Sequence, residues 1–276
     1  MDRVDLHVHT DKSDGTCSID EVVKQAVKAN LRAIAITDHD TVEAIPQALE
    51  LVKEKNLEII PGIELSAEEQ EIEFHVLGYF LNYKSKTLLD KLRLMQKIRR
   101  ERIGKICKKL TACGCPVSTE EVFSLAQGSY AVGRLHVAKV LILRKYVKTI
   151  KDAFDKFLSP GRPAYERKYK LSIEDAIQVI NQAGGISVLA HPLVSGGEEI
   201  IQDLVDKGLA GIEVYHTEHR DSQSDKLIEI AEKNKLLITG GSDYHGSFRN
   251  KIFLGSVTVS YSVVEEMKQL LTPLLD

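Results

Sequence analysis

The sequence predicts an α/β fold in which strands and helices alternate around a parallel sheet or barrel, interrupted by an all-helical insertion. Three observations support this prediction. Short apolar segments alternate with amphipathic ones in both the first and the last third of the chain. Only helical patterns occur between residues 84 and 165. His, Asp and Glu residues follow the apolar segments, which is where reactive groups gather in such folds. We therefore expect one barrel from residues 1–83 and 166–276, with residues 84–165 inserted as a lid or specificity element.

In the first part of the chain we expect two helices between short strands. Ser18 and Glu21 form a capping-box pattern at the start of the first helix, which should run to residue 30. The run from Leu31 to Thr37 is almost wholly apolar, as in a strand that is covered on both faces. The expected strands are 4–8, 31–37, 57–65 and 72–80, and the expected helices are 18–30 and 41–55.

The insertion begins with a long predicted helix over residues 88–110, which Gly114 and Pro116 end. Three shorter helices should follow, over 118–126, 134–144 and 149–158. One face of the long helix is basic, and we interpret most of that face as solvated. Its members are Lys97, Arg99, Arg100, Arg102, Lys105, Lys108 and Lys109.

The alternating pattern returns after the insertion. The expected helices are 172–183, 196–207, 220–234 and 263–271, and the expected strands are 185–190, 211–215, 236–239 and 252–260. His216 and His219 follow one of these strands, and the sequence is equally consistent with their being surface loop residues.

Composition excludes several classes of protein. The chain has 276 residues, 43% of them hydrophobic and 28% charged, which is ordinary for a globular protein. The net charge of −3 leaves no polybasic footprint, so we expect no duplex DNA partner, whereas a small phosphorylated ligand remains compatible. The four cysteines lack paired zinc-site spacing and are expected to be reduced thiols. No secretory or membrane-spanning segment is evident, so we expect no membrane partner and a cytoplasmic location.

Histidines and carboxylates at the predicted strand ends suggest a metal site. His7 and His9 lie two apart on a strand and point to the same side. Taken alone, the pair is equally consistent with one core-packed and one solvent-facing histidine. Further residues of metal-binding type make core packing hard to sustain for both. They are His39, Glu64, His75, His191, Asp243 and His245.

These residues carry a resemblance to a known family. The segments Asp-Leu-His-Val-His, Ser-Asp-Gly, Ile-Thr-Asp-His-Asp, Gly-Ile-Glu, Ala-His-Pro and Gly-Ser-Asp-Tyr-His, with a strand histidine, resemble the polymerase and histidinol phosphatase (PHP) family of metal-dependent phosphoesterases. Gly-Arg-Leu-His-Val-Ala and Phe-Leu-Ser-Pro-Gly-Arg-Pro-Ala-Tyr resemble its TrpH-type branch. The resemblance implies a distorted seven-stranded β/α barrel. It also implies hydrolysis of nucleoside 3′,5′-bisphosphates or 5′ to 3′ trimming of short RNA.

The resemblance further implies three divalent ions per chain. His7, His9, Glu64 and Asp243 would hold one ion, while Glu64, His75 and His191 would hold a second, with Glu64 bridging. Asp14, His39 and His245 would hold the third. Imidazole and carboxylate ligands suit Mn²⁺, our first expectation, as well as Fe²⁺ or Zn²⁺. Asp11 and Asp40 lie close in sequence and are candidates for orienting the histidines.

We expect a phosphatase that removes the 3′-phosphate of a nucleoside 3′,5′-bisphosphate. Metal ions would neutralise the phosphate and lower the pKa of water from ~15.7 toward about 7. Arg134, His136 and Arg162 are the expected substrate contacts, because an arginine at a helix N-terminus suits a phosphate. Asp243 or His245, besides acting as ligands, are candidates for moving a proton to the leaving oxygen. The alternatives are a 5′-3′ exoribonuclease acting on short RNA ends, a histidinol-phosphate phosphatase and a metal-stabilised interaction module without activity.

Overall fold

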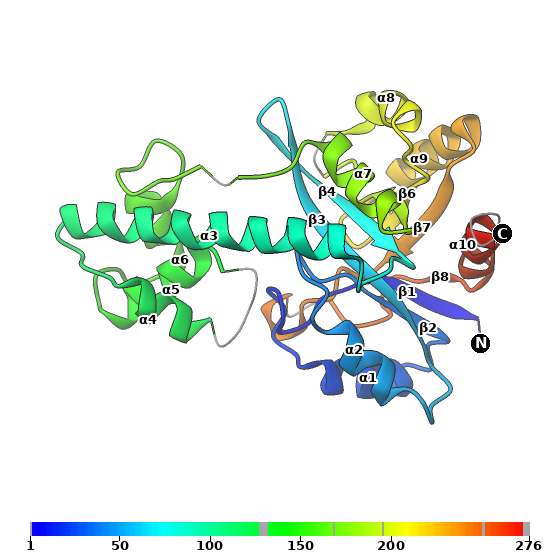
Figure 1. The fold of residues 1–276 in the computed structure, drawn as a ribbon, viewed down its shortest axis with the longest axis horizontal. Helices are drawn as coiled ribbons and strands as arrows, with labels where there is room; N and C mark the ends of the chain where they lie inside the picture. Colours follow the sequence, from blue (N-terminus) through cyan, green and yellow to red (C-terminus); the bar gives the residue numbers. More distant parts are fainter. Residues whose placement is uncertain (1, 127–131, 168, 195, 250–251, 273–276) are drawn as a thin grey trace. The chain divides into compact units, whose positions relative to one another are not determined.

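The structure is a computed structural model that describes residues 2–126, 132–167, 169–194, 196–249 and 252–272 (Figure 1). The chain divides into two compact units. The barrel unit comprises Met1–Lys91 and Leu171–Asp276, and the helical unit comprises Leu92–Lys170. Among the described residues, the chain has no helix with the length and apolar character needed to cross a membrane.

The barrel unit is built on a mixed sheet that nearly closes into a barrel. Its described strands occur in the order β7-β6-β5-β4-β3-β2-β1-β8. After β7 the chain runs alongside β1, where the amide of His9 donates to the carbonyl of Tyr244 over 2.9 Å. The strands are β1 Arg3–Val8, β2 Ala33–Ile36, β3 Glu58–Glu69, β4 Ile72–Tyr79, β5 Ile186–Leu189, β6 Gly211–His216, β7 Leu237–Gly241 and β8 Val259–Ser260.

The sheet is not all parallel, which corrects one expectation. β4 runs antiparallel to both β3 and β5. Gln70 and Glu71 form the connection between β3 and β4, and both have positive φ, of 47° and 70°. Two such residues make a tight hairpin turn, whereas a parallel return needs a long crossover. The very short link between the two apolar runs therefore already specified a hairpin.

Two expected elements of the barrel unit are shorter than predicted, although the barrel itself is confirmed. The described sheet forms the expected barrel and counts eight strands because it includes the short β8, which pairs with β1. The strand expected over 252–260 shrinks to β8, since the amide of Gly255 turns inward and donates to Asp5 over 2.8 Å. The helix expected over 41–55 is only α2 (Ile45–Leu51), with Pro46 in its first turn, a position that proline favours.

Helices accompany the strands of the barrel unit, much as the periodicity predicted. Ser18 and Glu21 form the expected capping box of α1. The segment after Gly196 begins as a short 3₁₀ turn before α8. The bounds are α1 Ile19–Lys28, α7 Ile173–Gln182, α8 Ile201–Asp206, α9 Asp221–Asn234 and α10 Ser262–Leu271.

The described part of the helical unit has its own apolar core. The long helix α3 (Lys86–Ala112) begins in the barrel unit and continues into this one. It is followed by α4 (Thr119–Leu125), α5 (Arg134–Leu143) and α6 (Ile150–Ala153), and the last of these continues as a π turn to Leu158. The core residues come from every one of these helices, and they include Ile103, Leu110, Val122, Val137, Leu141, Ala153 and Leu158.

Candidate metal centre

The barrel unit brings together every residue expected to bind metal. We call His7, His9, Asp14, His39, Glu64, His75, His191, Asp243 and His245 the ligand set. His7, Glu64 and His75 lie within β1, β3 and β4, and the others lie in loops that follow β1, β2, β5 and β7. Residues separated by more than 200 positions in the chain therefore meet at one end of the sheet, as ligands in an α/β barrel do.

One group within the ligand set surrounds Glu64 and Asp243. Nε2 of His7 lies 3.2 Å from Oε2 of Glu64 and 3.4 Å from Oδ1 of Asp243. Nε2 of His9 lies 3.1 Å and 3.2 Å from the same two oxygens. These four ligand atoms all lie within 4.8 Å of one another, as the ligands of one ion must.

The second oxygen of Glu64 faces a different pair of histidines. Oε1 lies 2.8 Å from Nδ1 of His75 and 3.3 Å from Nε2 of His191. The carboxylate thus presents one oxygen to each of two neighbouring groups of imidazoles. This geometry is compatible with the bridging role that the family resemblance implies for Glu64.

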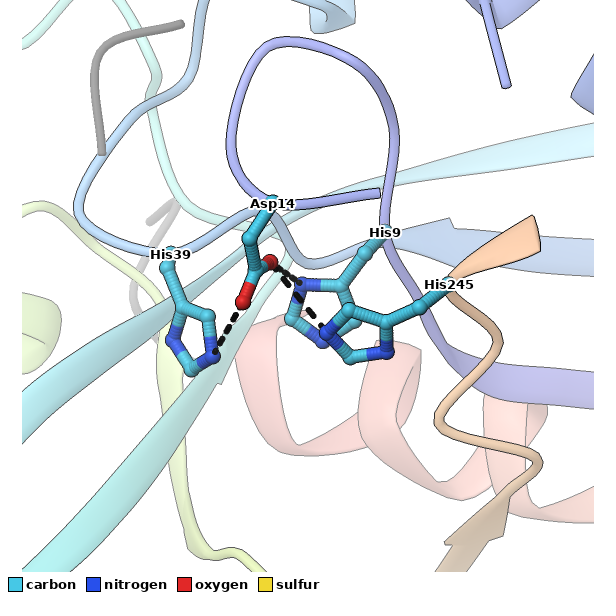
Figure 2. A group of neighbouring side chains, drawn as sticks. All are labelled: His9, Asp14, His39 and His245. Carbon is cyan, nitrogen blue, oxygen red and sulfur yellow. Dashed lines mark ion pairs between the residues drawn. The ribbon is translucent and has the colours of Figure 1, made fainter. Parts of the chain in front are cut away.

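A third group surrounds Asp14, whose carboxylate lies between His39 on one side and His9 and His245 on the other (Figure 2). The distances are 3.2 Å from Oδ1 to Nε2 of His245, 3.6 Å from Oδ1 to Nδ1 of His9, and 3.8 Å from Oδ2 to Nε2 of His39. The rings of His9 and His245 stack with centroids 4.0 Å apart. His9 therefore adjoins this group as well as the first, which the sequence did not indicate.

The buried polar atoms of this region are arranged as metal ligands rather than as hydrogen-bond partners of one another. Several of them make no hydrogen bond although they are shielded from water, and this is costly unless another partner is provided. Divalent ions coordinated by imidazole and carboxylate would provide that partner. The atoms are His7 Nε2, both ring nitrogens of His9, Asp14 Oδ1, His39 Nδ1, Glu64 Oε2 and His191 Nδ1.

Burial and neighbouring charge shift the pKa values of the ligand set strongly. Burial lowers the pKa of His9, but contacts with Asp243 and Glu64 outweigh it and raise the pKa to about 10. Burial dominates at His39 and lowers its pKa to about 4. Burial raises the pKa of Glu64, yet the surrounding imidazoles, His39 and His75 first, bring it well below its usual range. The carboxylate at the centre is thus held ionised, as a metal ligand must be.

The backbone is also unusual at this end of the barrel. His191 and Asp243 have positive φ, of 30° and 52°, which only a small share of non-glycine residues adopt. Gly241 allows β7 to approach β1, because a Cβ there would lie 2.4 Å from Cβ of His7. The approach brings the loop that carries Asp243 next to His7.

Buried aspartates hold the surrounding loops through backbone and hydroxyl groups. Asp38 accepts hydrogen bonds from the amide and hydroxyl of Thr10, both at 2.7 Å. Asp5 accepts from the amide and hydroxyl of Ser242 at 2.9 Å and 2.6 Å. Asp40, expected to orient a histidine, accepts from the amide of Ser66 at 2.9 Å and from its hydroxyl at 3.1 Å.

Two residues that sequence reasoning did not assign lie against the ligand set. Oε1 of Glu213, which is fully buried, lies 2.9 Å from Nδ1 of His7. His216 is 5% exposed, and its Nε2 lies 3.4 Å from Oδ2 of Asp243, so it is not a surface loop residue. His219 is half-buried beside the ring of His216. The placement of an acidic residue inside an apolar strand was the signal available for Glu213.

The expected substrate contacts lie in the helical unit. Arg134 donates from Nη1 to the carbonyl of Leu158 over 3.1 Å. The Nδ1 of His136 accepts from the amide of Gly133 over 3.2 Å, and Arg162 is exposed. Arg102, expected on the solvated face of α3, is only 7% exposed, and its Nη2 has no hydrogen-bond partner. Burial, together with repulsion by Arg134 and Arg99, lowers the pKa of Arg102 to about 10.

Several known proteins are similar in sequence to this chain over most of its length. The chain is 32% identical over 248 residues to the 5′-3′ exoribonuclease Rnm of Salmonella typhimurium, covering 87% of this chain and 84% of that protein. It is 30% identical over 247 residues to a phosphoribosyl 1,2-cyclic phosphate 1,2-diphosphodiesterase of Eggerthella lenta, covering 88% and 94%. It is 28% identical over 253 residues to a 3′,5′-nucleoside bisphosphate phosphatase of Chromobacterium violaceum, covering 89% and 88%.

A solved structure agrees with these relatives. A protein from Bifidobacterium adolescentis described as a metal-dependent phosphoesterase superposes with a TM-score of 0.84 at 29% identity, covering 96% of this chain and 94% of its own. The fold, the clustered ligands and the relatives together define a metal-dependent hydrolase of phosphoric esters. The chain belongs to the PHP domain family, whose model matches residues 5–159.

Proposed function

We propose that this chain hydrolyses the 3′-phosphate of nucleoside 3′,5′-bisphosphates, such as adenosine 3′,5′-bisphosphate, to nucleoside 5′-monophosphate and phosphate. The observation that carries the proposal is the convergence of the ligand set in three neighbouring groups that share Glu64 and His9. The Chromobacterium violaceum relative, named for this activity, aligns with nearly the whole chain.

The proposed cofactor is a set of three divalent ions, with Mn²⁺ first and Fe²⁺ or Zn²⁺ as alternatives. When bound, such ions neutralise phosphate charge and acidify water, which a phosphomonoester needs for hydrolysis at neutral pH. Glu64 would hold two of them and Asp14 the third, each with the imidazoles described above. Nδ1 of His245 donates to the carbonyl of Asp243 over 2.9 Å, so its Nε2 keeps a lone pair toward Asp14. That contact favours the ligand role of His245 over the alternative role in proton transfer.

A second anionic group in the substrate is supported by the arginines of the helical unit. Arg102 is buried and repelled by Arg134, and one of its donors lacks an acceptor. A phosphate oxygen would satisfy that donor and relieve the repulsion. A substrate that carries a phosphate besides the one hydrolysed, unlike histidinol phosphate, would supply such a group. In this proposal Arg102 joins Arg134, His136 and Arg162 among the substrate contacts.

Phosphate release by the metal-loaded protein tests the proposal. We expect turnover of adenosine 3′,5′-bisphosphate with Mn²⁺, with adenosine 5′-monophosphate as product and about three ions per chain by elemental analysis. Adenosine 5′-monophosphate and histidinol phosphate serve as matched monophosphates. Cleavage of histidinol phosphate without cleavage of the bisphosphate would overturn the substrate assignment. Hydrolysis of phosphoribosyl 1,2-cyclic phosphate alone would assign the activity of the Eggerthella lenta relative instead.

Exonucleolytic trimming of short RNA from its 5′ end is a second candidate. The exposed basic residues of α3 recur every three to five positions, which places them along one side of the helix, where an RNA backbone could bind. They are Lys97, Arg100, Lys105 and Lys108. A 5′-phosphorylated pentanucleotide distinguishes the two activities. If RNA binds along this face, its KM should rise steeply between 50 and 200 mM salt, whereas the KM for the bisphosphate should rise less.

A further inference from the structure

The strand β6 presents two polar side chains, Glu213 and His216, to His7 and Asp243 of the ligand set. We propose that Glu213 and His216 are positioning residues that select which atoms of His7 and Asp243 face the metal centre, and that His216 contributes an N–H there rather than a ligand lone pair. This inference rests on the proposed metal centre. Its test therefore measures metal binding directly, separately from turnover.

Glu213 is fully buried and uses both carboxylate oxygens. Oε1 accepts a hydrogen bond from Nδ1 of His7 over 2.9 Å, and Oε2 accepts from the backbone amide of His191 over 2.9 Å. Because a neutral imidazole carries one proton, donation from Nδ1 leaves the lone pair of His7 on Nε2. That nitrogen is the one that faces Glu64 and Asp243. Glu213 thereby orients one candidate ligand by its ring and another, His191, by its backbone.

The hydrogen bonds of His216 specify the opposite tautomer. Its Nδ1 accepts from the backbone amide of Glu218 over 3.2 Å, so Nδ1 carries no proton. The proton of the neutral ring must therefore be on Nε2, which is buried, makes no hydrogen bond to the described residues and lies 3.4 Å from Oδ2 of Asp243. A nitrogen that carries a proton cannot coordinate a metal ion. His7, Glu213 and His216 lie close enough to hold an ion, but this pattern of protons argues against a fourth site.

The same reasoning limits what His216 can do in catalysis. If its Nε2–H were transferred to a substrate, the ring would become an imidazolate, because Nδ1 already accepts from Glu218. His216 therefore offers an N–H group toward Asp243 and is not a proton donor. Its target, Asp243, turns Oδ2 toward His216 and Oδ1 toward Nε2 of both His7 and His9. The N–H group thus faces Oδ2 of Asp243, which leaves Oδ1 as the ligand oxygen.

A bulge in β6 explains how two residues three apart reach the same site. Glu213 pairs with Thr239 and Tyr215 pairs with Gly240, so β6 has one more residue than β7 across this step. In a regular strand, Tyr215 would share the face of Glu213 and His216 would point away. The extra residue reverses the alternation, so Tyr215 is 39% exposed while His216 is buried.

Two substitutions of His216 separate the proposed role from that of a ligand. His216→Gln keeps an N–H donor near the position of Nε2, whereas His216→Leu removes it at similar volume. We expect His216→Gln to bind the wild-type number of Mn²⁺ ions with affinity within about threefold of wild type. We expect His216→Leu to weaken one ion roughly 10- to 100-fold, as loss of an outer hydrogen-bond partner typically does. Equal loss of an ion in both variants would show that His216 is a ligand, and wild-type binding by His216→Leu would remove its positioning role.

Glu213→Gln provides the second test, because an amide can accept only one of the two hydrogen bonds from His7 and His191. We expect about 10- to 100-fold weaker Mn²⁺ binding by calorimetry. Tyr215→Phe, on the exposed side of the same strand, should bind Mn²⁺ like wild type. If Glu213→Gln binds Mn²⁺ as tightly as Tyr215→Phe does, the inference fails. If the wild-type protein binds no metal, the proposed metal centre fails first.

Discussion

Glu213 and His7 share a fully buried hydrogen bond of 2.9 Å, formed between strands 206 positions apart in the sequence. The bond determines which ring nitrogen of His7 is left to face Glu64 and Asp243. A metal-binding geometry in this barrel therefore depends on residues outside the ligand set. The following predictions test the set and its supports.

Glu64 should be the most sensitive single ligand, because its two oxygens serve two groups of histidines. We expect Glu64→Gln to lose bound metal and to reduce phosphatase kcat/KM by more than about 100-fold, beyond what loss of an outer partner costs. Elemental analysis and phosphate release measure the two effects. Glu58→Gln is the matched control, since Glu58 lies on the same strand but pairs with Lys268 and Tyr261. Full metal content in Glu64→Gln would contradict the bridging role.

Substitution of Asp14 should remove one bound ion and leave the other ions in place. It lies 3.2 Å from His245 and 3.8 Å from His39 but outside the groups that contain Glu64. Asp14→Ala should therefore bind one ion fewer per chain than wild type. Native mass spectrometry reports the stoichiometry, and Asp20→Ala, which removes a surface carboxylate bonded to Gln47, serves as control. Complete loss of metal in Asp14→Ala would show that the groups do not fill independently.

The metal-dependent gain in stability should increase with pH. In the metal-free protein the pKa of His9 is raised from 6.5 to about 10, so its contribution to stability is full below pH 6.5 and declines as pH rises toward 10. The pKa of Glu64 is lowered below 4.5, so its contribution is present above that pH and is lost as the pH falls. Metal ions must displace the proton of His9. The rise in Tm between chelator and Mn²⁺ should therefore be larger at pH 8.5 than at pH 6.5, and a constant difference would contradict the assignment of His9 as a ligand.

Gly241 should tolerate no side chain. A Cβ there would lie 2.4 Å from both Cβ and the backbone nitrogen of His7. Gly241→Ala should lower the free energy of unfolding by at least about 1–3 kcal/mol, the usual cost of overpacking, in urea titrations. Gly104→Ala is the contrasting control, because its Cβ would meet only Thr119 Cγ2 at 3.8 Å within α3, where alanine is favoured over glycine by roughly 0.5–1 kcal/mol. Equal stability of the two variants would show that β7 can move away from β1.

Substitution of Arg102 should raise KM for a substrate with two phosphates more than for a substrate with one. Arg102→Met removes the donor that lacks a partner while keeping a long apolar stem. We expect KM for adenosine 3′,5′-bisphosphate to rise about tenfold or more, in line with loss of a charge-assisted hydrogen bond worth roughly 1.5–3 kcal/mol, with little change for adenosine 3′-monophosphate. Arg100→Met on the exposed side of α3 should behave like wild type. An equal rise for both substrates would indicate a structural role for Arg102.

Much of the fold could be predicted from the sequence because its local signals are strong. The capping box of Ser18 and Glu21 and the wholly apolar run of β2 both have the structures their patterns indicated. The hairpin between β3 and β4 was missed although the link between the two runs is too short for a parallel crossover, because Gln70 and Glu71 are not typical turn residues and positive φ is unusual for them. The strand expected over 252–260 is limited to the short β8, because the chain around Gly255 pairs with Asp5 rather than with a neighbouring strand.

The sequence by itself determined which residues could act as ligands, because His, Asp and Glu after apolar strands are conspicuous and match an ordered family pattern. It could not reveal that His216 lies against them, since a bulge with no sequence signature turns His216 inward, and for Glu213 it offered only the sign of an acidic residue within an apolar strand. It also could not separate buried Arg102 from its exposed neighbours on α3. Tertiary structure decided these points, because tautomers, burial and carboxylate orientation depend on contacts between strands distant in the chain.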